Sequence, residues 1–239
     1  MIGNESVNRF TLPAVPKRME EPPPRFLQSP ASLPLTTQSA ALPELKSVPL
    51  AQKASTLEEL KETIAHFDEC PLKATATNMV FGAGDPHARL MIIGEAPGAE
   101  EDRQGLPFVG ASGHLLDLML ISIGLKRSEV YITNILPWRP PGNRKPSEAE
   151  TALFTPFVRR HIALIRPKVL LLLGGSAVSA LMNTNAGITK TRGRWLTYTD
   201  TDITVQAMAS FHPAFLLRTP AQKKLAWRDL SAVREKLGH

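Results

Sequence analysis

A glycine-rich loop after an apolar stretch is the first place in this sequence where side chains could do chemistry. Residues 89–93 predict a buried strand, and residues 94–98 read Gly-Glu-Ala-Pro-Gly. Glu95 lies in this loop, and Glu101 and Asp102 follow it closely. Carboxylates at such a place can accept protons or offset positive charge. Because α/β proteins usually hold ligands at the carboxyl ends of their strands, we expect this loop to form one wall of a site.

Three other side chains lie in similar positions. A second turn rich in glycine and proline, residues 105–110, carries Phe108, while Asn134 and His212 stand at the ends of two further predicted strands. A side-chain amide can match a hydrogen-bond acceptor and a donor at once, and an imidazole can donate. The residue types alone leave structural interpretations open: an asparagine that caps its own turn, a core phenylalanine and a structural histidine.

Strands and helices must alternate to bring these loops together. The predicted strands are residues 89–93, 130–136, 168–173, 194–198 and 202–209. The stretch 168–173 is the most hydrophobic of them, as expected at the centre of a parallel sheet. Helices are predicted between most of these strands. The alternation indicates an α/β fold, a three-layer α/β/α sandwich with a mainly parallel central sheet.

Several helix boundaries follow from local signals. Ser55 and Glu58 have capping-box spacing, and Ser147 begins a second such box. Residues 111–123 are apolar nearly all round, which predicts a helix buried between other elements. Pro156 lies within the helix that Ser147 starts, so this helix is expected to kink or restart there.

The N-terminal region differs in composition from the rest. Residues 1–54 contain nine of the 21 prolines of this 239-residue chain and show no apolar periodicity. We expect a disordered tail over residues 1–54 and one folded domain over residues 55–239. The sequence of the tail does not indicate which partner it would bind.

Charge and cysteine content restrict the classes of partner and site. The net charge of +6 favours a polyanionic partner, nucleic acid first and an anionic membrane second. Cys70 is the only cysteine, so a disulfide within the chain and a cysteine-only metal site are excluded. Neither a membrane-spanning stretch nor a secretory signal is recognisable. We expect a cytoplasmic protein without a membrane partner.

Taken together, the loops resemble those of the uracil-DNA glycosylase superfamily, and its thermophile-type branch, family 4, most closely. The resemblance covers roughly residues 57–236. It rests on four motifs in the right order: residues 94–98 with Glu101-Asp102, residues 107–110, Thr133-Asn134 with residues 139–144, and His212-Pro213 with residues 216–218. It implies a monofunctional hydrolase that cuts the N-glycosidic bond of deoxyuridine in DNA, releases uracil and leaves an abasic site.

The resemblance also implies roles for individual residues. Asn134 would read the edge of a flipped uracil, on which Phe108 would stack. His212 would donate to the uracil oxygen that gains charge. The best-known relatives carry a catalytic aspartate where Ala96 stands here. Glu95 is therefore assigned to water positioning or cation stabilisation, with Asp102 as the competing carboxylate. Backbone amides of Ala96 and Gly98 would contact the base.

Contacts to the DNA backbone are implied by the same comparison. Leu216 and Leu217 would form an apolar wedge in the base stack, and Arg218 would hold a phosphate. Further phosphate contacts would come from Arg139, Arg144, Lys145, Lys190, Arg192 and Arg194.

One departure from family 4 concerns its iron–sulfur cluster, which four cysteines bind. Of these four positions only Cys70 keeps its thiol, and Phe67, Trp138 and Phe154 occupy the others. We predict that no cluster is present and that an apolar cluster holds these segments together instead, since burying one aromatic side chain contributes roughly 1.5–3 kcal/mol.

Two alternatives remain open at this point. The loss of the cysteines and of the aspartate would also suit a non-catalytic DNA-binding relative. A glycosylase with a different base preference is the other. We expect uracil-containing DNA as the partner, no cofactor and a monomer.

Overall fold

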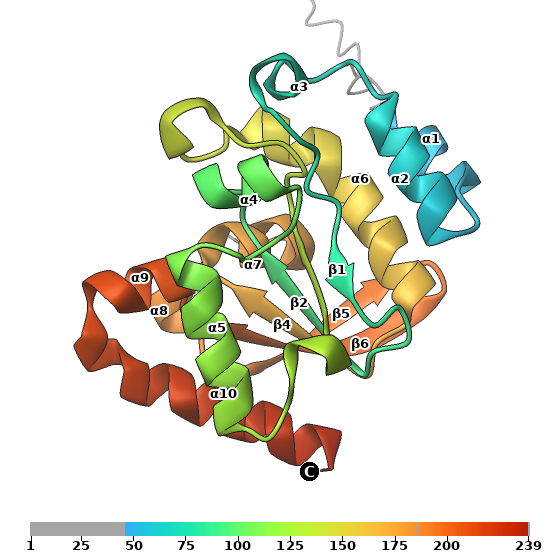
Figure 1. The fold of residues 1–239 in the computed structure, drawn as a ribbon. Coiled ribbons are helices and arrows are strands. Elements are labelled where there is room, and N and C mark those ends of the chain that lie inside the picture. The colour runs from blue at the N-terminus through green and yellow to red at the C-terminus, as the bar shows by residue number, and fades with distance from the viewer. Residues whose placement is uncertain (1–45, 185, 239) are drawn as a thin grey trace, which may run out of the picture. The chain divides into compact units, whose positions relative to one another are not determined.

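The computed structural model describes residues 46–184 and 186–238, which contain a six-stranded sheet between helices (Figure 1). The strands are β1 (Ala83–Gly84), β2 (Leu90–Gly94), β3 (Tyr131–Asn134), β4 (Val169–Leu173), β5 (Trp195–Asp200) and β6 (Ile203–Ser210). The α-helices are α1 (Ser47–Lys53), α2 (Leu57–Ala65), α3 (Leu72–Thr75), α4 (Ala99–Gln104), α5 (Ala111–Ser122), α6 (Glu148–Ile165), α7 (Gly175–Met182), α8 (Ile188–Thr191), α9 (Pro213–Arg218) and α10 (Lys223–Leu237). Short 3-10 helices are η1 (Arg127–Glu129), η2 (Pro141–Asn143) and η3 (Pro220–Gln222).

The sheet is mainly parallel, which confirms the predicted architecture. Its strand order is β1-β3-β2-β4-β6-β5. The four inner strands run parallel to one another, and β1 and β5 pair antiparallel at the two edges. Gly94 is paired directly with Asn134, so the ends of β2 and β3 lie side by side. The chain crosses from one side of β2 to the other after β3, which is the point where open α/β sheets bind ligands.

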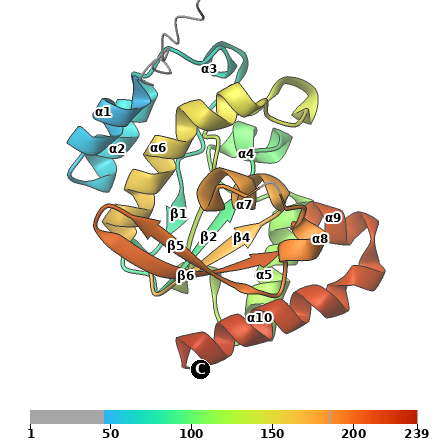
Figure 2. The same ribbon diagram turned by 180° about the vertical axis from the view of Figure 1, so that it is seen from behind.

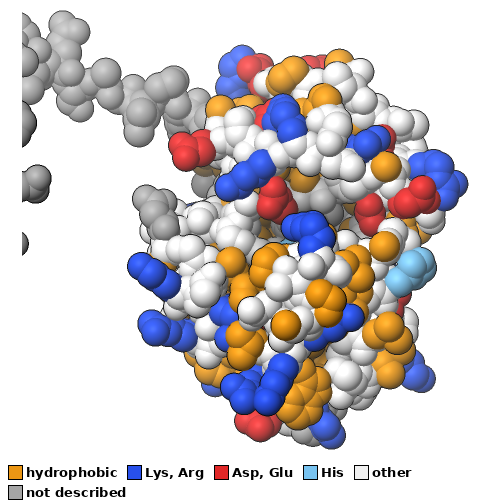
Figure 3. Space-filling model, turned by 90° about the vertical axis from the view of Figure 1, so that its left-hand side faces the viewer, with side chains coloured by type: hydrophobic (Ala, Val, Ile, Leu, Met, Phe, Trp, Pro, Cys, Tyr) orange, Lys and Arg blue, Asp and Glu red, His pale blue; other side chains and the backbone are white. Residues whose placement is uncertain are grey.

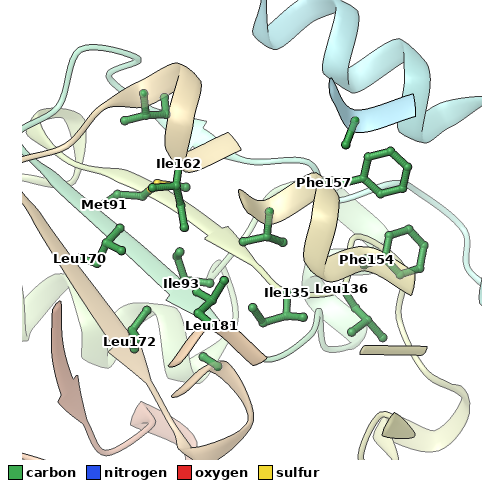
Figure 4. Close-up of a cluster of buried hydrophobic side chains, with 14 of the residues drawn as sticks. Met91, Ile93, Ile135, Leu136, Phe154, Phe157, Ile162, Leu170, Leu172 and Leu181 are labelled. Carbon is green, nitrogen blue, oxygen red and sulfur yellow. The ribbon is translucent and has the colours of Figure 1, made fainter. Parts of the chain in front are cut away.

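Both faces of the sheet are covered by helices. Along β2, Leu90 and Ile92 belong to one hydrophobic cluster while Met91 and Ile93 belong to the other, since neighbouring side chains on a strand point to opposite faces. Helices α6 and α7 cover the Met91 face, and α1 and α2 pack against α6 (Figure 2). Helices α5, α9 and α10 cover the Leu90 face. In Figure 4, Ile162 of α6 lies beside Met91 on the covered face.

The N-terminal boundary of the domain lies earlier than predicted. Residues 47–53, expected in the tail, form helix α1, whose Ala51 is buried in the core with α6. The earlier residues of the predicted tail lie outside the described part of the chain. Helix α2 is capped by Thr56, whose hydroxyl accepts from the amide of Glu59, rather than by Ser55. Two neighbouring hydroxyl residues offered alternative caps, and the predicted one was wrong by one position.

Two helices differ from the expectations in one respect each. Helix α6 does not restart at Pro156 but continues through it, and Phe154 and Phe157 on either side are buried in the same core. This packing outweighs the roughly 3 kcal/mol that an interior proline costs. Helix α5 is buried on one side only, and Leu118 and Ile121 are each 64% exposed. The helix forms an outer layer, so only its inner side meets the sheet.

The C-terminal part of the chain contains one helix that was not predicted. Residues 213–218, predicted as a loop, form α9, which starts at Pro213 directly after His212. Helix α10 buries the face that carries Ala226, Leu230, Val233 and Leu237, which lie at helical spacing. Within the described ranges, no helix combines the length and apolar character needed to cross a bilayer.

Candidate active site

A cleft of about 570 Å³ opens where the inner strands end. Figure 3 faces this side of the molecule and shows acidic and basic side chains around a hollow, with hydrophobic side chains below it. Eight of the predicted residues line the cleft: Glu95, Ala96, Gly98, Phe108, Asn134, Arg144, His212 and Arg218. They come from loops and helices after β2, β3 and β6, so the sheet brings together segments far apart in the sequence. Arg139, Leu216 and Leu217 do not line it.

Among the described residues that line the cleft, Asn134 carries a fully buried side-chain oxygen that has no hydrogen-bond partner. The residue is buried, and its Oδ1 accepts no hydrogen bond from any described residue. Gly94 makes room for it: a Cβ on Gly94 would lie 2.4 Å from Asn134 Oδ1 and 2.6 Å from Phe108 Cζ. Because leaving a buried polar group unpaired costs about 1–3 kcal/mol, an amide held in this state is suited to a ligand.

The ring of Phe108 forms another wall of the cleft. It lies 5.5 Å from the ring of His212, with an angle of 30° between the planes. The backbone of Phe108 has a φ of +52°, which non-glycine residues rarely adopt. Arg127 stabilises this conformation, since its guanidinium donates to the carbonyl oxygens of Phe108, at 2.9 Å, and of Pro107. Asp117 in turn accepts from Arg127 at 3.0 Å.

His212 presents a neutral imidazole to the cleft. Its Nδ1 accepts a hydrogen bond from the amide of Ala214 at 3.1 Å, so in the neutral ring the proton is on Nε2. Burial lowers the pKa of His212 to about 4; the charge of Arg218 adds to this effect and that of Glu101 opposes it. At neutral pH the ring is therefore an uncharged donor that can stabilise a developing negative charge.

The carboxylates around the first loop have different surroundings. Glu101 accepts from the amides of Gly98, Val109 and Gly110 at 2.8–3.0 Å, which ties the two loops of the cleft together. Asp102 does not line the cleft, and its Oδ1 accepts from the amides of Thr77 and Asn78.

Glu95 is in a different situation. It is half-buried in the cleft, and no described residue donates a hydrogen bond to its carboxylate. The neighbouring Glu100 is exposed and paired with Arg103. Of these four acids, Glu95 is the one with oxygens available to a water molecule or to a developing cation.

Several basic residues predicted to bind phosphate are engaged within the protein. Arg144 makes two bonds to Glu150, of 2.6 and 2.9 Å, which lower the pKa of that carboxyl to about 2. Arg139 donates to Asn143 at 2.7 Å and lies 3.9 Å from Asp102. The Arg192 guanidinium forms a buried ion pair with Asp229. Arg192 therefore stabilises the fold and is not available to DNA.

The two leucines of the predicted apolar wedge lie on helix α9 and face different ways. Leu216 is 1% exposed and belongs to the core beneath the sheet, so its assignment to DNA was wrong. Leu217, the next residue, is 43% exposed, and Arg218 is exposed. Consecutive residues on a helix point about 100° apart, which is why one leucine faces inward and the other outward.

The positions that correspond to cluster ligands in family 4 do not fit an iron–sulfur cluster here. Phe67, Cys70, Trp138 and Phe154 are all buried in one hydrophobic cluster. The rings of Phe67 and Phe154 pack edge to face at 5.9 Å. A single thiol, whose pKa burial raises, cannot replace four thiolates. Among the described residues, no group of three potential metal ligands is found. Trp138 Nε1 is buried without a partner there.

The positioning role of Glu101, which was named only as a carboxylate near the first loop, and that of Arg127 were not predicted from the sequence. Glu101 stands three residues after Gly98, the spacing of a capping box, so a local signal was present. For Arg127 no such signal exists, because its contacts with Phe108 cross a stretch of helix α5. Phe215 also lines the cleft and was not predicted.

Comparison with known proteins agrees with this geometry. The sequence profile of the uracil DNA glycosylase superfamily matches residues 81–231. A type-4 uracil-DNA glycosylase of Sulfurisphaera tokodaii is 38% identical over 185 residues, 75% of this chain and 84% of the relative. Those of Archaeoglobus fulgidus and Thermotoga maritima are 36% and 37% identical over 187 and 163 residues. These matches cover 77% and 68% of this chain and 94% and 83% of the relatives.

Proposed function

Because the chain belongs to the uracil DNA glycosylase superfamily, we propose that it hydrolyses the N-glycosidic bond of deoxyuridine in DNA. The products are free uracil and an abasic site. The observation that carries this proposal is the buried Oδ1 of Asn134, which has no hydrogen-bond partner among the described residues and belongs to the same cleft as Phe108 and the neutral His212. A base must leave the helix to reach such a cleft, as it does in other glycosylases.

Recognition of uracil rests on Asn134 and Phe108 in this proposal. Uracil offers an N3–H donor beside its O2 and O4 acceptors, and the amide of Asn134 can accept from one and donate to another. The ring of Phe108 stacks on the flipped base. The backbone at Ala96 and Gly98, which lines the cleft, contributes further contacts to the base.

Bond breaking rests on His212 and Glu95. As the glycosidic bond lengthens, negative charge gathers on the uracil oxygens and positive charge on the sugar. Nε2–H of His212 donates a hydrogen bond to the uracil oxygen that gains charge. The neutral ring already carries this proton, so no change of protonation is needed before the step. Glu95 positions the attacking water and offsets the sugar cation. Its lack of any described partner supports this assignment over Asp102 and Glu101.

Contacts to the DNA strand come from the mouth of the cleft. Leu217 is the exposed apolar residue that can enter the stack where the base has left, and Arg218 beside it holds a phosphate. Arg144 also lines the cleft, but it has to share its guanidinium between Glu150 and DNA.

We further propose that this chain acts without an iron–sulfur cluster. The support is chemical: three buried aromatic side chains and one thiol offer neither the charge nor the number of ligands that a cluster needs. Stoichiometric iron and the visible absorption of a cluster in the purified protein would contradict this proposal.

Oligonucleotides that contain one uracil test the activity. The protein should release uracil, so that alkali then cuts the strand at the abasic site. An identical oligonucleotide with thymine should stay intact. No cutting of the uracil strand, in a preparation whose circular dichroism shows a folded protein, would leave a non-catalytic DNA-binding relative as the function.

Substitutions test the assigned roles. Asn134→Asp keeps the shape of the side chain but removes its donor, so the rate should fall at least about 100-fold. The rate of Glu95→Gln should fall by a similar factor, about 100-fold or more. Glu62→Gln, on an exposed acid of α2 that does not line the cleft, is the matched control. Equal rates for Glu95→Gln and Glu62→Gln would remove Glu95 from the mechanism.

A further inference from the structure

The first two turns of α10 expose a basic surface that the reaction described above does not use. Lys223, Lys224 and Arg228 are exposed there, together with Trp227, which is 55% exposed. Residues 213–228 contain no aspartate or glutamate. Lys223 and Trp227 are four residues apart, as are Lys224 and Arg228, so each pair lies one above the other on the helix. We refer to these four residues as the α10 surface.

The cations of the α10 surface differ from three of the arginines that were predicted to bind phosphate. Arg139, Arg144 and Arg192 each face a carboxylate of the protein. No described carboxylate lies within ion-pair distance of Lys223, Lys224 or Arg228. Unpaired positive charge on a surface without acids is complementary to a phosphate backbone.

Trp227 adds an aromatic face to this charge. Trp227 lines a groove of about 190 Å³ between α5 and α10, together with Leu118 of α5 and Lys223 of α10. Leu118 is 64% exposed. A nucleobase can be held between aromatic and apolar side chains in this way, and stacking on an exposed aromatic residue is a common mode of single-strand binding.

Helix α9 connects the α10 surface with the mouth of the cleft, since its Leu216 lines the groove beside Trp227. Ala214, Phe215 and Arg218 of α9 line the cleft, and α10 begins shortly after α9 ends, following the short helix η3. Figure 1 shows α9 and the start of α10 on the same side of the molecule. In Figure 3, basic and hydrophobic side chains lie next to each other below the hollow. A strand whose phosphate is held by Arg218 therefore has a path toward Trp227.

We propose that the α10 surface binds the single-stranded DNA that flanks the uracil nucleotide. Lys223, Lys224 and Arg228 contact phosphates, and an unpaired base stacks on Trp227 in the groove beside Leu118. In a duplex the faces of the bases are covered by their neighbours, so Trp227 favours single-stranded over double-stranded substrates. This inference rests on the proposed function because it extends the DNA path from the same cleft.

Binding to uracil-free DNA tests the surface independently of catalysis. The probe is fluorescein-labelled oligothymidine, with the same sequence in a duplex for comparison. Trp227→Ala should weaken single-strand binding about five-fold or more and duplex binding less. Lys223→Ala/Lys224→Ala should lower the slope of log affinity against log salt by roughly 1.4. The charge-matched control is Lys53→Ala/Lys61→Ala, on exposed lysines of α1 and α2.

Tryptophan fluorescence separates stacking from loss of folding. Oligothymidine should quench the intrinsic fluorescence of the full chain, and Trp227→Phe should abolish most of the quenching while keeping most of the affinity. If Trp227→Ala and Lys223→Ala/Lys224→Ala bind single strands as tightly as the unchanged protein does, the inference is wrong. A protein partner would then be the occupant to test for the groove. Uracil release, assayed on the same preparations, decides the proposed function separately.

Discussion

Arg127 donates a hydrogen bond of 2.9 Å to the carbonyl oxygen of Phe108, whose ring lies in the cleft. The backbone of Phe108 has a φ of +52°, a conformation that costs of the order of 1–3 kcal/mol and persists only where its surroundings hold it. Gly113 allows this approach, since a Cβ there would lie 1.8 Å from the same carbonyl oxygen. Arg127 thus positions the stacking ring from behind the cleft.

Replacement of Arg127 should therefore impair the reaction without removing any residue of the cleft. In Arg127→Ala, Phe108 can relax to an ordinary backbone conformation, and kcat/KM for a uracil oligonucleotide should fall about ten-fold, equivalent to roughly 1.4 kcal/mol. Arg103→Ala, on an exposed arginine paired with Glu100, is the control. A rate for Arg127→Ala equal to that of the control would show that Phe108 holds its position without help.

Gly94 should be intolerant of even one added methyl group. In Gly94→Ala the Cβ would lie 2.4 Å from Asn134 Oδ1 and 2.6 Å from Phe108 Cζ, so one of the two must move. We expect a loss of uracil release far larger than the loss of stability measured by urea unfolding. Gly187→Ala is the control because a Cβ at Gly187 meets nothing within 4 Å. Full activity in Gly94→Ala would place base recognition elsewhere.

The activity should be insensitive to pH down to about pH 5. His212 has a pKa of about 4 and stays neutral above it, so its Nε2–H remains a donor while Nδ1 accepts from Ala214. Protonation near pH 4 places a proton on Nδ1 and breaks that contact, so kcat should fall there. A decline centred near pH 6.5, the ordinary value for histidine, would contradict the neutral donor.

Stability should depend on pH in the same direction. Burial lowers the pKa of His161 to about 3, and His161 contacts the hydroxyl of Tyr131 at 2.8 Å. Since the unfolded chain takes up protons near pH 6.5 and the folded chain does not, stability falls as the pH drops from about 6.5 toward 3. Urea unfolding at a series of pH values measures this, although carboxylates such as Glu150 add to the fall below about pH 4.5.

The aromatic cluster should carry the stability that a metal cluster would otherwise supply. Phe154 is fully buried and packs against Phe67 and Phe157, so Phe154→Ala should lower the free energy of unfolding by about 3–5 kcal/mol. A chelator such as EDTA should leave the Tm of the unchanged protein where it is. A marked drop in Tm with the chelator would mean that a metal stabilises the fold.

Elements whose boundaries depend on neighbouring residues, such as a capped helix and an apolar strand, were predicted correctly from the sequence. Ser147 and Glu150 form the predicted capping box, with each side chain bonded to the other's backbone amide. Residues 168–173 read as a central strand, and β4 lies in the middle of the sheet. Helix α1 was missed because its short apolar pattern lies in a stretch dominated by prolines, and its stability comes from packing on α6.

The site was predicted less completely than the fold. The cleft does contain Asn134, His212 and Phe108, which the motifs indicated. The sequence could not show that Leu216 turns into the core, because the helix that turns it begins at a His-Pro pair read as a loop. Nor could it show that Arg139 and Arg144 face Asp102 and Glu150, since these contacts depend on how two loops fold toward each other.

The pairing of Gly94 with Asn134 links assembly to catalysis. Side chains alternate along a strand, so a slip of β3 against β2 by one residue would turn the amide of Asn134 to the opposite face of the sheet. A misregistered molecule could be compact and helical and still be inert toward uracil. During refolding, the return of uracil release would therefore report that β2 and β3 have paired in the correct register.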